Sequence, residues 1–247
     1  MLFVFAKNRP KAESKPAEDK VAVLAVSNAN ESTVTAPGGN GFAKLYDSLR
    51  LNFMGLSQQA FQYAMQGVSY LSKAGKITND KVISIVDFSQ PSSKKRLFVI
   101  DLEQYKVVFN TYVAHGVNSG KEYAEQFSNR PESNQSSLGF YETMDTYNGK
   151  NGYSLHLQGL ESGINDKADS RAIVMHGAPY VNEGLIQSQG YIGRSWGCPA
   201  VPEKLHKPII NKIKNGTCLF IYSPNKNYFI HSKILKDATA MAFNNKS

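Results

Sequence analysis

The sequence predicts a mainly β protein with a short helical pair near its N-terminus and one late helix. Apolar residues recur at three- and four-residue steps in residues 42–74 and again near residue 209. From residue 82 onward, short β-branched and aromatic runs alternate with loops rich in Ser, Asn and Gly. Strands do not alternate with long helices, which argues against a doubly wound parallel fold.

The length and composition indicate a globular chain. It has 247 residues, enough for one large domain or for one domain with an appendage. Its 13 Phe, 13 Tyr and one Trp supply a sizeable core, which excludes a wholly disordered chain. No run of about 18 apolar residues occurs, so no transmembrane helix is predicted. Two cysteines make neither a disulfide scaffold nor a four-ligand zinc site, and no metal or cofactor is predicted.

The charge is positive but dispersed. There are 28 Lys and Arg against 20 Asp and Glu, a net charge of +8. Such a balance suits nucleic acid, an anionic membrane surface or an acidic polymer. The densest basic cluster is Lys94, Lys95 and Arg96, which predicts a solvated surface. The sequence has no basic helix and no alternation of Arg with aromatics, so nucleic acid is not predicted as a partner.

Residues 1–41 are expected to form a tail or tether. Residues 7–41 lack aromatics, carry three prolines and end in a glycine-rich run. Residues 1–7 are similar to the remnant of an export signal, although the apolar run is short and no basic segment precedes it. Export therefore cannot be deduced from this terminus alone.

Residues 42–80 are expected to form a helical subdomain packed on the domain that follows. The apolar spacing predicts two short helices, interrupted near Gly55. Ser57 is a suitable N-cap for the second helix, and Gly75 is a suitable C-terminal stop.

Residues 81–235 are expected to form the main domain, with residues 236–247 as a C-terminal tail. The late helix is expected to carry Pro208 in its first turn and to stop at Gly216. The predicted strands lie in residues 82–88, 97–102, 106–114, 138–143, 153–157, 172–175 and 217–222.

The two cysteines occur in different settings. Cys218 lies in an apolar strand run and is expected to be a small core residue. Cys198 lies in a turn-like segment whose glycines free the backbone and whose Arg194 favours a thiolate. Taken alone, Cys198 is also consistent with an inert buried thiol or with a disulfide to Cys218.

A nucleophilic cysteine needs a base, and two histidines are candidates. His176 ends a predicted strand 22 residues before Cys198 and is followed by glycine. His115 forms a second His-Gly pair at another strand end, so the choice between them is open at this level. His206 and His231 lie among polar residues, which predicts surface positions.

Two segments together are more specific than either alone. RAIVMHGAPYV at 171–181 and GRSWGCPAVP at 193–202 resemble the signature of the L,D-transpeptidase catalytic domain family, in its murein branch. The resemblance covers residues 42 to about 230. It implies a mainly β catalytic domain, a sandwich or barrel, without a metal or cofactor.

The resemblance also implies roles. Cys198 would attack a carbonyl of a peptidoglycan stem peptide, and His176 would act as general base and then as acid. The carbonyl of Gly177 would orient the imidazole, and the N–H groups of Gly197 and Cys198 would hold the oxyanion. The acyl group would pass to an amine, or to water in L,D-carboxypeptidase cleavage.

Two departures from the family pattern concern substrate binding. Trp196 stands where many members have His, and Ala200 stands where many have an Arg linked to a substrate carboxylate. Arg194, together with Ser195 and Trp196, is therefore expected to bind substrate. His115 and Arg171 are candidates for the cleft. For a substrate carboxylate, Arg171 is a weaker candidate than Arg194, because it lies about 15 Å or more from His176 along an extended strand.

The resemblance implies a periplasmic or cell-envelope location. Two alternatives remain open on the sequence. One is a cysteine peptidase that uses the same two residues on proteins. The other is a non-catalytic wall-binding module in which Cys198 is structural.

Overall fold

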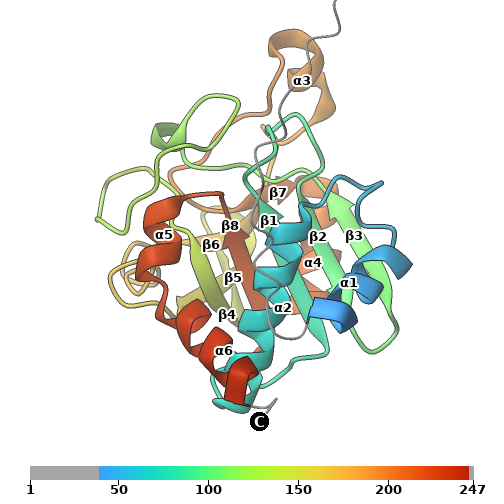
Figure 1. Cartoon of the computed structure of the whole chain (residues 1–247). Helices are drawn as coiled ribbons and strands as arrows, with labels where there is room; N and C mark the ends of the chain where they lie inside the picture. Colours follow the sequence, from blue (N-terminus) through green and yellow to red (C-terminus); the bar gives the residue numbers. More distant parts are fainter. Residues whose placement is uncertain (1–38, 245–247) are drawn as a thin grey trace, which may run out of the picture. The chain divides into compact units, whose positions relative to one another are not determined.

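In the computed structural model, which describes residues 39–244, eight strands form one sheet (Figure 1). The predicted mainly β architecture is confirmed, since every predicted run overlaps a strand. One further strand, only three residues long, was not predicted. The strands are β1 Val82–Asp87, β2 Leu97–Asp101, β3 Lys106–Thr111, β4 Gly139–Gly149, β5 Gly152–Gly159, β6 Val174–Ala178, β7 Ala200–Pro202 and β8 Cys218–Tyr222.

The sheet nearly closes into a barrel. Its order is β3-β2-β1-β8-β4-β5-β6-β7, so β3 and β7 are the edges. Just beyond β3, Ala114 forms an antiparallel bridge with Ala200 of β7, and Gly116 bridges Ser195. The Ala114 bridge gives the β7 edge a backbone partner at Ala200, where an uncovered edge would expose unpaired donors and acceptors. We call residues 114–116 and 195–200 the seam.

Helices cover both faces of the central strand β1. α2 packs on β1 and β8, and α4 packs on β6, β5, β7 and β1. All six residues of β1 are buried, as expected for a strand covered on both faces. The helices in residues 39–244 are α1 Gly39–Ser48, α2 Gln58–Lys73, α3 Glu183–Gln189, α4 Glu203–Ile213, α5 Lys226–His231 and α6 Lys233–Asn244.

The helical pair follows the sequence prediction. α1 and α2 flank the expected break, and the Ser57 hydroxyl accepts a hydrogen bond from the Ala60 amide at 3.3 Å. This bond satisfies one of the free amides at the start of α2. Gly75 follows the helix in a left-handed conformation, with φ 63°.

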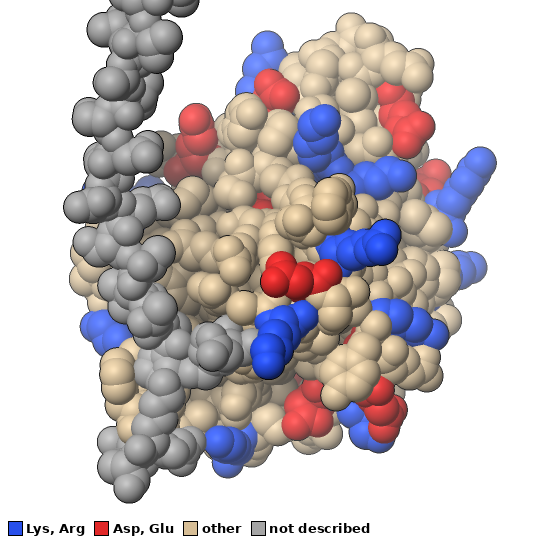
Figure 2. All heavy atoms as spheres, turned by 45° about the vertical axis from the view of Figure 1, so that its right-hand side comes forward, with Lys and Arg blue, Asp and Glu red and all other residues tan. Residues whose placement is uncertain are grey.

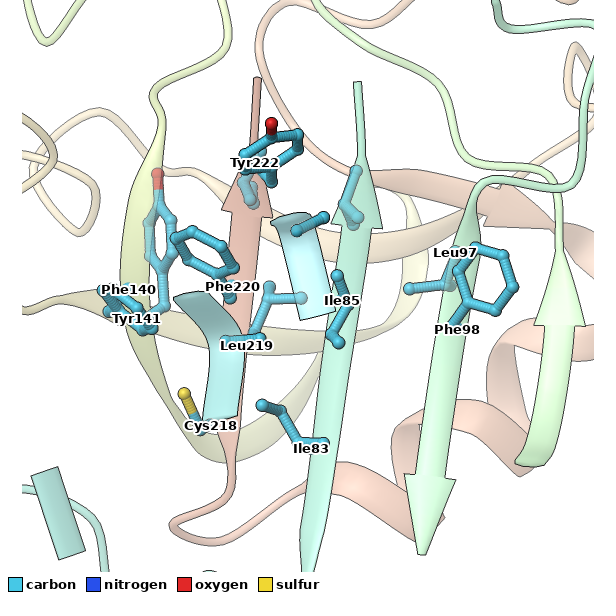
Figure 3. Close-up of a cluster of buried hydrophobic side chains, with 14 of the residues drawn as sticks. Ile83, Ile85, Leu97, Phe98, Phe140, Tyr141, Cys218, Leu219, Phe220 and Tyr222 are labelled. Atoms are coloured by element: carbon cyan, nitrogen blue, oxygen red, sulfur yellow. The ribbon is translucent and has the colours of Figure 1, made fainter. Parts of the chain in front are cut away.

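The core contains the thiol that was predicted to be buried. Cys218 is fully buried beside Leu219 and the stacked rings of Phe140 and Phe220, whose centroids are 4.2 Å apart (Figure 3). Both Cys198 and Cys218 are free, so no disulfide joins them. Cys218 therefore acts as a small apolar side chain in this core.

The C-terminal part is more helical than predicted. The late helix begins at Glu203, so Pro208 lies inside it rather than in its first turn. α3, α5 and α6 were not predicted. Residues 236–244 were expected to form a tail but belong to α6. This helix packs on α2, and its Asp237 accepts a hydrogen bond from the Tyr70 hydroxyl of α2 at 3.0 Å.

Three other expectations concern the surface and the terminus. On the face shown in Figure 2, Lys and Arg are separated by acidic and uncharged residues. Arg96, expected on a solvated surface, is instead fully buried.

None of the helices in residues 39–244 has the length and apolar character needed to cross a membrane. The predicted tether lies outside the described residues, except that α1 already begins at Gly39.

Candidate active site

Cys198 lies in residues 191–199, which we call the Cys198 loop and which lead from α3 into β7. The Ser195 hydroxyl accepts a hydrogen bond from the Gly197 amide at 3.0 Å and donates one to the Cys198 carbonyl at 2.7 Å. Gly197 has φ 125°, and a Cβ there would lie 2.8 Å from the Gln135 carbonyl oxygen, so only glycine fits. Ser195, which the sequence predicts to bind substrate, is buried and closes this turn.

The Cys198 thiol is partly shielded from water. Its sulfur lies 3.6 Å from the carbonyl oxygen of Ala172. Burial raises the pKa of the Cys198 thiol, and the Val174 backbone and the Arg171 charge only partly oppose this. At neutral pH the resting group is therefore mainly the thiol, which needs a base before it can attack.

His176 lies on β6, next to the strand that the Cys198 loop enters. It pairs in register with Ala200 of β7, two residues beyond Cys198. Its Nδ1 donates a hydrogen bond to the Gly177 carbonyl oxygen at 2.9 Å, because a carbonyl can only accept. The unprotonated nitrogen of the neutral ring is then Nε2. Burial and the neighbouring His206 lower the pKa of His176, while the Gly177 bond raises it.

The two amides expected in the oxyanion hole differ. The Gly197 N–H is already bonded to the Ser195 hydroxyl. The Cys198 N–H donates to no other backbone group or side chain of residues 39–244. Only the Cys198 amide is therefore free to receive a developing negative charge.

His115 has neither ring nitrogen free. It is fully buried, and its Nδ1 accepts a hydrogen bond from Arg96 at 2.7 Å, because a guanidinium can only donate. Its Nε2 must then carry the proton and donates to the Gly120 carbonyl oxygen at 3.2 Å. Burial, with the Arg96 charge, lowers the pKa of His115 to about 3. The second His-Gly pair thus offers no acceptor to a thiol.

Arg171 lies nearer to the Cys198 loop than the sequence indicated. The chain is not extended here, because Ala172 is left-handed with φ 52°. A Cβ on Gly197 would lie 3.4 Å from the Arg171 guanidinium. That guanidinium also donates to the Ser128 and Gln135 carbonyls at 2.8 and 2.7 Å. Arg171 therefore holds the loop of residues 128–137 against the Cys198 loop.

Arg194 and Trp196 are the more accessible residues of the Cys198 loop. The Trp196 side chain is 76% exposed. Arg194 is half-buried and donates to the Gly120 carbonyl at 3.2 Å. Its guanidinium lies 5.7 Å from the centre of the Tyr191 ring, and the Lys121 ammonium lies 5.4 Å from the same ring. Neither cation forms an ion pair with a carboxylate of residues 39–244.

His206 is a residue of the site that sequence reasoning missed. It was expected on the surface, but its ring lies against Gly177, where a Cβ would come within 2.8 Å of it. Its Nδ1 donates to the carbonyl of Glu203 in its own helix. The residues next to His206 in the sequence are polar, so it was predicted to lie on the surface. In the structure α4 packs on β6, and this contact brings His206 against Gly177. The spacing of His206 from α4's apolar residues was the only available signal.

No metal site accompanies this arrangement in the described part of the chain, where no three His, Cys, Asp or Glu side chains gather as a ligand set. The chemistry available from the described residues is that of a thiol, an imidazole and one free backbone donor, the Cys198 amide. Such groups suit nucleophilic attack on a carbonyl.

The fold and this geometry define a mainly β domain with a thiol and an imidazole on neighbouring segments of a nearly closed sheet. Residues 53–222 match the sequence profile of the L,D-transpeptidase catalytic domain, so the chain belongs to this family. The resemblance that the sequence suggested is thereby confirmed. No curated protein sequence matches the chain.

Several solved structures are similar at low identity. An L,D-transpeptidase from Mycobacterium smegmatis is 12% identical over 58% of this chain and 59% of its own, with a TM-score of 0.36. An Enterococcus faecium L,D-transpeptidase is 14% identical over 57% and 50%, with a TM-score of 0.35. L,D-transpeptidase 3 from Mycobacterium tuberculosis is 12% identical over 58% and 61%, with a TM-score of 0.33. The chain therefore spans less than two thirds of each of these proteins.

Proposed function

We propose that this chain is a cysteine L,D-transpeptidase that acts on stem peptides of peptidoglycan. Cys198 is the nucleophile, and His176 is the general base and then the acid. The observation that carries the proposal is the hydrogen bond from His176 Nδ1 to Gly177, which leaves Nε2 as the acceptor on a residue that pairs with Ala200, two residues beyond Cys198. The activity belongs in the periplasm or cell envelope, where its substrate is found.

The reaction proceeds through a thioester. As the sulfur of Cys198 attacks the carbonyl that follows an L-centre, its proton passes to Nε2 of His176. The negative charge on the carbonyl oxygen is received by the Cys198 amide. Collapse breaks the C–N bond, and the leaving amine takes the proton from His176. An acceptor amine, or water in L,D-carboxypeptidase cleavage, then attacks the thioester carbonyl while its proton passes to His176. The C–S bond breaks and His176 returns the proton to the Cys198 sulfur, which leaves a cross-link or a free acid as product.

The resting pair is neutral. The pKa of Cys198 is raised by burial and that of His176 is lowered by burial, so a thiolate–imidazolium pair is disfavoured before substrate arrives. Proton transfer therefore accompanies attack instead of preceding it. This ordering limits reaction of the thiol with other electrophiles.

Substrate carboxylates are bound by Arg194, with Trp196 as an exposed apolar contact. Arg194 and Lys121 share one aromatic ring and have no carboxylate partner among the described residues. An anion relieves the repulsion between two such cations, and a guanidinium binds a carboxylate with two parallel bonds.

The test is incubation of the protein with a purified stem tetrapeptide and an amine acceptor, followed by mass spectrometry of the products. We expect loss of the terminal D-residue together with an amide to the acceptor or a hydrolysed tripeptide. An all-L peptide of the same length is the control and should remain intact.

Two other results would contradict the proposal. Cleavage of the all-L peptide, with the stem peptide intact, would indicate a cysteine peptidase that acts on proteins. Binding of peptidoglycan without turnover, with Cys198 resistant to alkylation, would indicate a wall-binding module.

A further inference from the structure

Arg96 is a buried cation without a carboxylate partner. Its side chain is 0% exposed, and it forms no ion pair with any Asp or Glu of residues 39–244. Asp87 is buried nearby, but its carboxylate accepts hydrogen bonds from Ser57 and Ser89 instead. Removing a guanidinium from water costs free energy unless its N–H donors are satisfied. The hydrogen-bond acceptors of Arg96 therefore indicate its role in the structure.

Most of those partners lie in one short segment beyond β3. Nε and Nη2 of Arg96 donate to the Val113 carbonyl at 3.1 and 3.0 Å, and Nη2 also donates to His115 Nδ1 at 2.7 Å. Only Nη1 bonds elsewhere, to the Gln90 carbonyl at 2.9 Å. The guanidinium lies 4.7 Å from the centre of the Phe88 ring. Arg96 thus fixes residues 113–115, which enter the seam.

His115 extends this anchorage to the Cys198 loop by two routes. Its backbone carbonyl accepts a hydrogen bond from the Ser195 amide at 2.9 Å. Its Nε2 donates to the Gly120 carbonyl, which also accepts from the Arg194 guanidinium at 3.2 Å. Arg194 and Ser195 are consecutive, and the Ser195 hydroxyl closes the turn that carries Cys198.

We propose that Arg96 and His115 form a buried positioning pair that sets the Cys198 loop for attack. Neither residue touches substrate. The pair acts through His115 on Gly120 and Ser195, and through them on Arg194 and Cys198. This inference rests on the proposed function of Cys198 as the nucleophile.

A role as core filling does not account for these contacts. An apolar ring at position 115 would fill the same space against Phe88, whose ring meets that of His115 edge-on at 5.9 Å. It would accept nothing from Arg96 and donate nothing to Gly120. The charged Arg96 is buried without a counter-ion, and three of its four hydrogen bonds go to Val113 and His115.

The experiment compares His115→Phe with the wild type. Phe keeps the ring and removes both hydrogen bonds. Tyr228→Phe is the matched control, because it removes a buried hydrogen bond of 2.9 Å to Glu161, away from the seam. The measurements are kcat, KM, Tm and the rate at which iodoacetamide alkylates Cys198, followed by mass spectrometry. His115→Gln, whose amide both accepts and donates, tests rescue.

We expect His115→Phe to lower kcat about 100-fold, because a displacement near 1 Å has that effect on a nucleophile. KM should rise by a smaller factor than kcat falls, because the pair reaches the proposed substrate contact Arg194 only through the Gly120 carbonyl. The alkylation rate of Cys198 should change, and His115→Gln should restore part of kcat. Tyr228→Phe should lower Tm and leave kcat and alkylation as in the wild type.

A lowered Tm with wild-type kcat and alkylation in His115→Phe would overturn the positioning role. If His115→Phe does not fold, His115→Asn carries the same test, because its shorter amide reaches Arg96 but not Gly120. If the wild type converts no stem peptide, the proposed function fails. The alkylation rate of Cys198 then still tests the positioning role of Arg96 and His115. A rate in His115→Phe equal to that of the wild type would overturn this role.

Discussion

The two His-Gly pairs show how one dipeptide serves opposite purposes. His176 is held at a single nitrogen by the carbonyl of Gly177, and its other nitrogen is an acceptor. His115 is held at both nitrogens, by Arg96 and by Gly120. Burial lowers the pKa of each, yet only His176 keeps a lone pair for a thiol. A free nitrogen, rather than a perturbed pKa, therefore distinguishes the histidine that we propose as the base from the histidine that is held at both nitrogens.

Replacing His176 should have the largest effect. His176→Gln removes the proposed acceptor of the Cys198 proton, and kcat should fall about 1,000-fold, within the usual range for a lost general base. Stopped-flow measurement of acylation checks this. A residual rate near that of the wild type would show that another group takes the proton.

The glycines of the two His-Gly pairs, Gly116 and Gly177, should respond differently to replacement by alanine. A Cβ on Gly116 would lie 2.4 Å from the Asn134 carbonyl oxygen, which belongs to backbone, and we expect Gly116→Ala to lower the free energy of unfolding by about 3 kcal/mol. A Cβ on Gly177 would meet the ring of His206 at 2.8 Å, and a side chain moves more easily. Gly177→Ala should therefore lower kcat about 10-fold with a smaller loss of stability. Urea unfolding and steady-state kinetics separate the two, and equal losses of stability would contradict the distinction.

Arg194 provides a smaller effect on the substrate side. Arg194→Lys keeps the charge but loses the two-pronged bond to a carboxylate, so KM for the stem peptide should rise about 10-fold. The melting temperature should change little. A large melting shift with unchanged KM would assign Arg194 to the scaffold, through its bond to Gly120.

The smallest expected effect concerns pH. His176 must be neutral to accept a proton, and its lowered pKa keeps it neutral to a more acidic pH than an ordinary imidazole. The acid limb of kcat/KM should therefore lie below the usual histidine range. Because the neighbouring His206 lowers the pKa of His176, His206→Phe should move this limb to higher pH. A limb that moves to lower pH in His206→Phe would contradict the assignment.

Much of the fold could be predicted because its signals are local. The cap at Ser57, the break near Gly55 and the β-branched runs depend on neighbouring residues, and the structure has them where predicted. β7 could not be predicted, because three residues carry no pattern and its pairing is with distant segments. α6 was missed because its apolar face is defined by α2.

The site was predictable only in part. The spacing of Cys198 and His176 was visible in the sequence, whereas the engagement of the Gly197 amide by Ser195 depends on how one turn folds. Lys94 and Lys95 are exposed but Arg96 is buried, which only the closure of the seam explains. Contacts between residues distant in the chain decide such cases, and composition does not encode them.

The most direct test of the account is to locate the acyl group that the protein forms with a stem tetrapeptide. Peptide mapping after rapid acid quenching should find the thioester on Cys198 in the wild type and in Cys218→Ala. No adduct should form in Cys198→Ala, although that variant should melt like the wild type. An adduct on Cys218, or continued turnover by Cys198→Ala, would contradict the assignment of Cys198 as the nucleophile.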